Sequence, residues 1–263
     1  MSNEVVPQAL PVKYRLLKQC VGAIICSQLA GKLIAFIYGN RIPFRGTVID
    51  VSQTHVSSKN KALLFWGLYE SAEVRFVDKY TLPDIPAIDL GASLGAISSH
   101  IASRLQPGTQ LICIEGNPKL NLTLRQNLER NASHLAFEII QAAIGYGVET
   151  VTFALADDNL YSRKTGQRTS VTAEVPAIKL TDAVRKLTSS RYQLISDIEG
   201  AELEILRQDL DSLKGCQQII IELHSVKENG TFVTVEDMLN QLQSCGFEII
   251  DRYGSVAVLR RRA

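Results

Sequence analysis

The stretch Ile85–Gly95, IPAIDLGASLG, decides the fold. A short apolar run, AIDL, precedes a turn that contains two glycines, and a helical stretch follows as far as QPG at 106–108. In an open α/β sheet, ligands bind where a strand's carboxyl end meets the N-terminus of the next helix. Glycine lets the backbone approach a ligand closely and adopt a positive φ. The stretch therefore predicts the first strand–turn–helix unit of such a sheet, with a ligand over the turn 91–95.

The same alternation of apolar strands and amphipathic helices continues to the end of the chain. The further runs are QLICIE (110–115), FEIIQAAI (137–144), YQLISDI (192–198), QQIIIEL (217–223), FEIID (247–251) and SVAVLRR (255–261). This order predicts an α/β fold with a mostly parallel sheet and helices on both faces. RYG joins the last two runs, which predicts a hairpin and one antiparallel strand at the end of the sheet.

Two segments depart from this alternation. Residues 147–178 read as an inserted β-hairpin, whose polar loop over 157–170 is a candidate clamp for the acceptor. The first 80 residues read as a helical N-terminal extension, so we expect two regions, 1–80 and 81–263. Within the extension, apolar spacing predicts helices over 14–38 and 61–80, and the residues between them predict a short β piece.

Composition and charge narrow the class of protein. A net charge of +1 argues against nucleic acid as a partner. The five cysteines have no zinc-site spacing, and reduced thiols indicate a cytoplasmic protein. The N-terminus does not resemble a signal peptide, and the uncharged stretch 19–31 is too short to span a bilayer. A homodimer contact or a peripheral membrane contact through the first helix stays open as an alternative.

Two acidic residues indicate which ligand the turn binds. Asp89 ends the first strand, where a dinucleotide-binding fold usually has its first glycine, and the full G-x-G-x-x-G pattern is absent. A carboxylate there would repel a pyrophosphate but suits an ammonium and a sulfonium. Glu115 ends the second strand and can accept two hydrogen bonds from a ribose diol. The pair predicts S-adenosylmethionine as cofactor, with S-adenosylhomocysteine as its product.

At this point the sequence resembles the FkbM family of S-adenosylmethionine-dependent methyltransferases. The motifs that carry the resemblance are GLYES (67–71), IDLGASLG (88–95), CIEGNP (113–118), LRQNLERN (124–131), QAAIG (141–145), VPAIKLTDAV (175–184), SDIEGAELEILR (196–207) and IIIELH (219–224). The resemblance implies a class I, Rossmann-like methyltransferase sheet with the cofactor over its first two strands. It also implies a hydroxyl acceptor, commonly on a sugar or a polyketide-type metabolite.

The resemblance assigns parts of the cofactor to individual residues. It places the methionine end against Asp89, Gly91 and Gly95, with Ala92 and Ser93 in the same turn. Glu115 would hold the ribose, and the adenine would be bordered by Asn117, Gln141 and Ala142. Tyr69 and Glu70 precede the sheet and could close over the cofactor.

The catalytic candidates follow the fourth and fifth strands of the sheet. Methyl transfer is an in-line displacement, so the protein supplies alignment and, for a hydroxyl, a proton acceptor. We expect neighbouring strands to bring Asp197 and Glu199 together with Glu222 and His224. Asp197 and His224 are the candidate base or orienting groups, and the ordinary pKa of histidine, close to neutral, makes His224 the best single base. Glu199 is the candidate for positioning the acceptor. These residues could together hold a metal ion, but nothing in their spacing is specific to one, and none is expected.

The sequence therefore predicts an S-adenosylmethionine-dependent O-methyltransferase acting on a hydroxyl of a sugar, glycan or secondary metabolite. Two alternatives remain open. One is methylation of nitrogen on a small molecule or protein. The other is a methyltransferase-like domain that serves only as a binding module.

Overall fold

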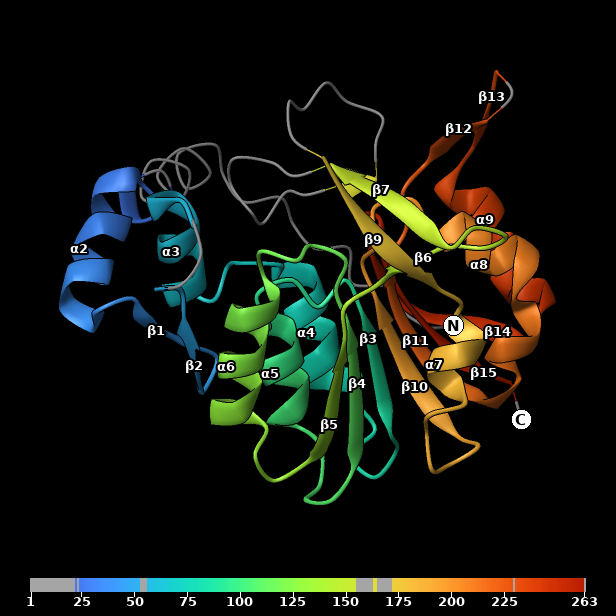
Figure 1. The fold of residues 1–263 in the computed structure, drawn as a ribbon, viewed down its shortest axis with the longest axis horizontal. Helices are drawn as coiled ribbons and strands as arrows, with labels where there is room; N and C mark the ends of the chain where they lie inside the picture. The colour runs from blue at the N-terminus through green and yellow to red at the C-terminus, as the bar shows by residue number, and fades with distance from the viewer. Residues whose placement is uncertain are drawn as a thin grey trace, which may run out of the picture.

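The computed structural model describes residues 22, 24–52, 56–154, 163–164, 172–228 and 230–262. Its centre is a seven-stranded sheet in the order β14–β15–β11–β10–β3–β4–β5 (Figure 1). The strands are β3 (Ala87–Leu90), β4 (Gln110–Ile114), β5 (Ala136–Ile140), β10 (Tyr192–Ser196), β11 (Cys216–Glu222), β14 (Phe247–Tyr253) and β15 (Val256–Arg261). Strands β5, β4, β3, β10 and β11 pair in parallel, which confirms the mostly parallel α/β sheet.

The C-terminal hairpin is present, but its antiparallel strand is not at the end of the sheet. Strand β15 pairs antiparallel with both β11 and β14, so β14 forms the edge. The reason lies in burial. Four consecutive residues of β15, Val256–Leu259, are buried, which requires cover on both faces, whereas Glu248 and Arg252 of β14 are exposed.

Helices cover both faces of the sheet (Figure 1). Helices α4 (Ser71–Tyr80), α5 (Ala96–Ala102) and α6 (Asn121–Asn131) lie on one face; α7 (Leu180–Val184), α8 (Glu202–Gln208) and α9 (Val235–Ser244) lie on the other. Side chains alternate between the two resulting cores: Leu111 and Cys113 of β4 pack with the first set, Ile112 and Ile114 with the second. Burial on both faces explains why this strand reads as a continuous apolar run.

In the described part of the N-terminal extension, helices α2 (Gln28–Tyr38) and α3 (Ser58–Phe65) lie on either side of a β-hairpin along the chain, and α4 follows them. The strands of the hairpin are β1 (Arg41–Phe44) and β2 (Thr47–Asp50). Residues 14–21 and 23 of the helix predicted over 14–38 lie outside the described residues, and its described part is not continuous, because Ser27 has extended backbone and caps the start of α2. The single helix predicted over 61–80 is wrong. It is divided into α3 and α4, because Gly67 (φ 62°) and Glu70 (φ 43°) have left-handed backbone that an α-helix cannot continue through.

The hairpin β1–β2 is bound to the sheet's helical layer. The Asp50 N–H donates to Asn127 Oδ1 at 2.7 Å, and Asn127 Nδ2 donates to the Asp50 and Leu94 carbonyls at 3.1 and 2.8 Å. Ile42 and Ile49 of the hairpin belong to the same buried cluster as α5 and α6. The extension thus shares a hydrophobic core with the helices of the sheet. The division into regions 1–80 and 81–263 stays a prediction.

A second, smaller sheet follows β5. Strands β7 (Thr150–Ala154) and β9 (Thr172–Ile178) pair antiparallel within the segment where the sequence predicts a hairpin. They are joined by β6 (Ala143–Ile144), parallel to β9, and β8 (Arg163–Lys164), antiparallel to β7. The predicted run 137–144 is therefore two strands in two sheets. Apart from β8, the polar loop 157–170 lies outside the described residues.

Three smaller elements complete the described part of the chain: the 3-10 helix η2 (Leu210–Gly215) and the hairpin of β12 (Val226–Glu228) and β13 (Thr231–Val233). Among the helices that the structure describes, none is long and apolar enough to cross a membrane. Helix α2 leaves Leu29, Leu33, Phe36 and Ile37 exposed. A dimer or membrane contact through this helix stays a prediction.

Candidate active site

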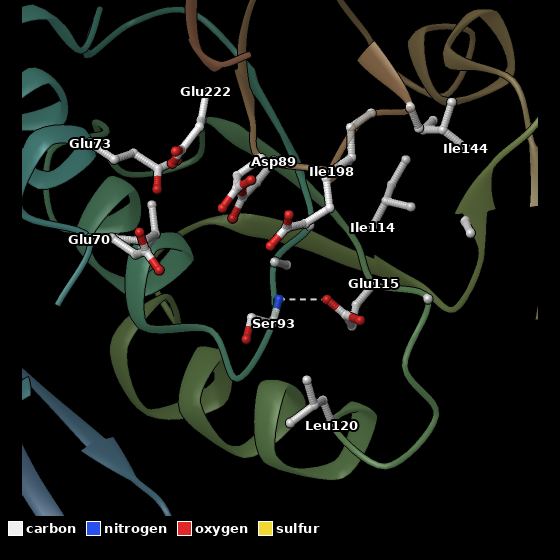
Figure 2. Close-up of a pocket in the computed structure, with 18 of the residues that line it drawn as sticks. Glu70, Glu73, Asp89, Ser93, Ile114, Glu115, Leu120, Ile144, Ile198 and Glu222 are labelled. Atoms are coloured by element: carbon white, nitrogen blue, oxygen red, sulfur yellow. Dashed lines mark hydrogen bonds between the residues drawn. The ribbon is translucent and has the colours of Figure 1, made fainter. Parts of the chain in front are cut away.

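One pocket lies at the carboxyl ends of β3, β4, β10 and β11, and the start of α4 closes its side. Figure 2 shows its two chemical halves. Acidic side chains from Glu70, Glu73, Asp89 and Glu222 lie on the left, and the apolar side chains of Ile114 and Ile144 lie on the right, with Glu115 below Ile114. Of the predicted site residues, all except Gly95, Asn117 and Gln141 line this pocket.

The glycine turn after β3 forms the floor of the pocket. Gly91 has φ 84°, and a Cβ on it would lie 1.9 Å from the Asp197 carbonyl oxygen, so only glycine fits there. The N–H groups of Gly91 and Ala92 donate to the Ile114 carbonyl at 3.0 and 3.1 Å. The turn is thereby held between the ends of β4 and β10.

Asp89, at the end of β3, is 2% exposed and accepts a hydrogen bond from the Ser98 hydroxyl. Burial raises its pKa from 3.8 to about 6. A buried carboxylate with this pKa is costly to ionise without a cation nearby. Its environment therefore favours a positively charged ligand group, as the sequence predicts.

Glu115 follows β4 and is held by backbone donors (Figure 2). Its Oε2 accepts from the Ser93 N–H at 2.7 Å and its Oε1 from the Asn117 N–H at 2.6 Å. Burial raises its pKa from 4.5 to about 7. A carboxylate has about four acceptor positions, so this fixed group can still accept two hydroxyls of a ribose.

Two residues predicted to border an adenine have other partners. Asn117 is fully buried, and its Oδ1 accepts from the Lys119 N–H at 3.0 Å, which shapes the loop before α6. Gln141 Oε1 accepts from Asn121 Nδ2 at 2.7 Å. The pocket wall beyond Glu115 is instead apolar: Ile114, Leu120, Ala142, Ala143 and Ile144. Sequence reasoning missed these residues, except Ala142, because apolar residues near strand ends look like ordinary core.

Gly95 has a packing role. It begins α5 with φ 85°, and a Cβ on it would lie 2.9 Å from Leu124 Cδ1 of α6. The residue thus allows α5 and α6 to approach each other and does not line the pocket.

The acidic half of the pocket is built by the register of β10 and β11. Ser196 pairs with Ile221, so Asp197 and Glu222 follow side by side. Asp197 Oδ1 is buried and has no hydrogen-bond partner among the described residues. His224 Nδ1 lies 3.3 Å from Glu202 Oε1, and its Nε2 lies 3.5 Å from Glu199 Oε2. The expectation that the strands bring these groups together is confirmed.

Glu202 is a positioning residue that the sequence did not reveal. It is 1% exposed, and its carboxylate accepts from the Ile198 N–H at 3.1 Å and the Gly200 N–H at 2.7 Å. Between these two residues, Glu199 has a left-handed backbone with φ 53°. Glu202 thus holds both the loop that carries Glu199 and the imidazole of His224. The only sequence signal was an acidic residue in the first turn of a helix, which is common for dipole reasons.

The protonation states differ from those expected from ordinary pKa values. The hydrogen bond that the Glu202 carboxylate accepts from the His224 imidazole raises the pKa of His224 from 6.5 to about 9, so the imidazole is protonated at neutral pH and is not the base. Burial, with repulsion from Glu222 and Glu70, raises the pKa of Asp197. Its pKa of about 8 makes the ionised form of Asp197 a stronger proton acceptor than an ordinary aspartate, and this form predominates above that pH.

The start of α4 contributes two further carboxyl groups. Burial, followed by repulsion from Glu222 and Glu199, raises the pKa of Glu70 to about 7. Glu73 is 8% exposed, and burial raises its pKa well above 4.5. Glu73 was missed by sequence reasoning; its spacing of three from Glu70 at a helix start could have indicated a shared face.

Comparison with known proteins identifies the family. The model of the methyltransferase FkbM domain matches residues 89–249, more than half of the chain. The chain belongs to the FkbM methyltransferase family. Its sheet, with the antiparallel strand second from one edge, is the class I methyltransferase sheet that the sequence predicts. Family membership identifies the chain as a methyltransferase.

Solved structures with similar folds come from distant proteins. They include Aeropyrum pernix fibrillarin in complex with S-adenosyl-L-methionine (14% identity, 73% of this chain and 74% of that one, TM-score 0.43). M. jannaschii TYW2 in complex with AdoMet is 16% identical over 84% of this chain and 85% of that one, with a TM-score of 0.43. Geobacter metallireducens precorrin-6y C5,15-methyltransferase is 13% identical over 73% and 89%, with a TM-score of 0.41. No curated protein matches the chain significantly.

Proposed function

We propose that this FkbM-family protein transfers a methyl group from S-adenosylmethionine to a hydroxyl of a sugar, glycan or secondary metabolite. The observation that carries the proposal is a single pocket with two distinct ends. Asp89, the glycine turn and Glu115 line one part, and the carboxylates and imidazole after β10 and β11 line the other. A cofactor and an acceptor can therefore meet in one cavity.

The residues present fit S-adenosylmethionine. The Gly91 turn leaves room that a Cβ would fill, Glu115 offers fixed acceptor atoms for a ribose, and the wall beyond it is apolar enough for an adenine. The buried carboxylate of Asp89 favours the positively charged methionine end. The bound cofactor supplies an electrophilic methyl group.

The residues after β10 and β11 supply alignment and a proton acceptor. As the new carbon–oxygen bond forms and the methyl–sulfur bond breaks, the acceptor hydroxyl must lose its proton. Asp197 takes this proton, since its carboxylate is buried and has an oxygen without a partner in the described structure. His224, held by Glu202, donates a hydrogen bond to an acceptor oxygen, and Glu199 accepts one from a neighbouring hydroxyl.

The charge of the pocket favours a hydroxyl over an amine. Carboxylates close to a bound amine raise the pKa of its ammonium form, so the nitrogen keeps its proton. A protonated nitrogen has no lone pair with which to attack the methyl group. A hydroxyl is neutral and has both a proton to donate and lone pairs to attack. The chain's net charge of +1 likewise supports a small acceptor and not a nucleic acid.

Release of S-adenosylhomocysteine over a panel of sugars and hydroxylated metabolites, each paired with its amino analogue, tests the proposal. We expect turnover with a hydroxylated compound only. Asp197→Asn and His224→Ala should lose turnover yet bind S-adenosylhomocysteine as the wild type does. Glu248→Gln, on the exposed side of β14, is the control.

Three results would contradict the proposal. Full turnover in Asp197→Asn would show that Asp197 is not the proton acceptor. Turnover with the amino analogues alone would indicate an N-methyltransferase. No thermal shift with S-adenosylmethionine or its product would indicate a binding module.

A further inference from the structure

The described lining of the pocket contains many more carboxyl groups than basic side chains. Among the described residues that line it there is one histidine and no lysine or arginine. The acidic lining residues are Glu70, Glu73, Asp89, Glu115, Asp197, Glu199 and Glu222. The ion pairs of the one histidine, His224, are with Glu199, Glu202 and Glu222. The carboxylates on the side of α4 therefore lack a cation within the described part of the chain.

Two carboxyl groups that line this space have an oxygen without a hydrogen-bond partner among the described residues. Asp197 Oδ1 is buried and unpaired in the described structure. Glu73 is more than nine-tenths buried, lines the pocket, and makes no hydrogen bond or ion pair with another described residue. Figure 2 shows its side chain directed toward Glu222. Buried carboxylates are normally paired or bound to a metal, so these two indicate a missing ligand.

The carboxylate oxygens converge with the spacing of metal ligands. Glu70, Asp197 and Glu222 each offer an oxygen, and these atoms all lie within 4.8 Å of one another. Asp197 also belongs to a second such group with Glu199 and His224. The imidazole of that second group already contacts Glu202 and Glu199. The first group, composed only of carboxylates, is the better candidate.

We propose that Glu70, Asp197 and Glu222 together bind one divalent metal ion that prefers oxygen ligands, such as Mg²⁺ or Mn²⁺. Carboxylates are the ligands that these ions prefer, and an ion of this kind keeps several positions for water or substrate oxygens. Glu73 lies beside these ligands, where its carboxylate can hold an ion-bound water. The sequence offered no metal-specific spacing because the three ligands come from three segments far apart in the chain.

The ion's role in catalysis rests on the proposed function. A divalent ion beside Asp197 would bind the acceptor hydroxyl and lower its pKa, which makes the proton easier to transfer. The ion would also lower the pKa of Asp197, and the proton would pass to the Asp197 oxygen that does not hold the ion. Binding of the ion itself does not depend on the reaction. It can therefore be measured without cofactor and without acceptor.

The test is a titration of the metal-free full chain with Mn²⁺, in which the electron paramagnetic resonance signal of free Mn²⁺ is followed. We expect one ion per chain, displaced by excess Mg²⁺. Glu222→Gln and Asp197→Asn should weaken binding about tenfold or more. Glu115→Gln removes a carboxylate from the same pocket but not from the ligand set, so it should bind as the wild type does. Thermal melting checks that each variant is folded.

No Mn²⁺ binding by the wild type at millimolar concentration would overturn the proposal. So would equal affinity in the wild type and both ligand variants, or an equal loss in Glu115→Gln, which would indicate only diffuse negative charge. Spermidine binding to the cluster in place of Mn²⁺ would overturn it too, in favour of an amine site. Binding of S-adenosylhomocysteine in excess EDTA is measured separately, so that a failed metal site is distinguished from a failed cofactor site.

Discussion

Replacing the Glu115 carboxylate by an amide should remove a pH dependence from cofactor binding. The carboxyl group of Glu115 is buried, and its pKa is raised from 4.5 to about 7 chiefly by that burial. A ribose diol donates its hydrogen bonds to the ionised form. The cofactor therefore binds best once the group has lost its proton, and binding should tighten as the pH rises through the pKa of the free protein.

The size of the effect follows from linkage. With a pKa of about 7, roughly a tenth of the free protein has ionised Glu115 at about pH 6 and roughly nine-tenths at about pH 8. The dissociation constant of S-adenosylhomocysteine should thus fall about tenfold over this range, or about 1.4 kcal/mol. In Glu115→Gln the amide has no proton to lose in this range, so the variant should bind more weakly and lack this tenfold change.

Folding stability gives an independent readout of the same group. The pKa in the folded chain lies above the unfolded value of 4.5, so the unfolded chain releases its proton first as the pH rises. The free energy of unfolding should therefore fall between about pH 4.5 and about pH 7, by about 3 kcal/mol from this one group. The difference between wild type and Glu115→Gln isolates this contribution, because other groups cancel.

Isothermal titration with S-adenosylhomocysteine and urea unfolding, both repeated from about pH 5 to about pH 8, make the two measurements. The Glu248→Gln variant, with the same chemical change on an exposed strand, should follow the wild type in both. An identical pH dependence of cofactor affinity in the wild type and Glu115→Gln would refute the placement of the ribose at this carboxylate. An identical pH dependence of unfolding would refute the raised pKa.

Three further substitutions test how the site is built. Gly91→Ala should abolish cofactor binding and destabilise the fold more than the control Gly108→Ala does. Both glycines have a left-handed backbone (φ 84°), which costs an alanine about 1 kcal/mol, but only a Cβ at position 91 would also collide with the Asp197 carbonyl. Equal losses of stability in urea unfolding would contradict this. Asn127→Ala should cost about 3 kcal/mol or more in urea unfolding, because it leaves buried backbone groups of β2 and the turn before α5 without partners; a loss within the error of the measurement would show that the hairpin does not depend on it. Glu202→Gln should lower kcat about 100-fold while S-adenosylhomocysteine affinity stays constant, because it displaces the loop that carries Glu199 and the imidazole of His224. A change in cofactor affinity alone would argue against this positioning role.

The parallel sheet could be predicted because each strand carries its own local signal. A strand buried on both faces must be apolar throughout, as in β4, and the helix that follows it shows its own periodicity. The position of β15 lacked such a signal. That strand and β14 are both short apolar runs, and which of them pairs with β11 depends on packing across the sheet and not on either run alone.

The cofactor half of the site was also accessible to sequence reasoning, because its residues lie at predictable points. Asp89 and Glu115 each end a strand, and parallel neighbours place strand ends at one edge of the sheet. The adenine wall was not accessible in the same way. Ile144 reaches it only because the chain leaves the main sheet at Ile140 and enters the smaller one.

The part of the acidic cluster that comes from the start of α4 lay beyond sequence reasoning for a different physical reason. Asp197 and Glu222 could be paired from the order of the strands, but Glu70 and Glu73 reach them only through the left-handed turn that divides α3 from α4. In one continuous helix over 61–80, Glu70 and Glu73 would not have been placed by this turn. The same turn therefore interrupts the predicted helix and brings these two carboxyl groups to the cluster. A non-glycine residue with positive φ is strained, and such strain persists where the surroundings hold it. At Glu70 that strain places a carboxylate beside Asp197 and Glu222, which is the arrangement that a divalent ion would stabilise.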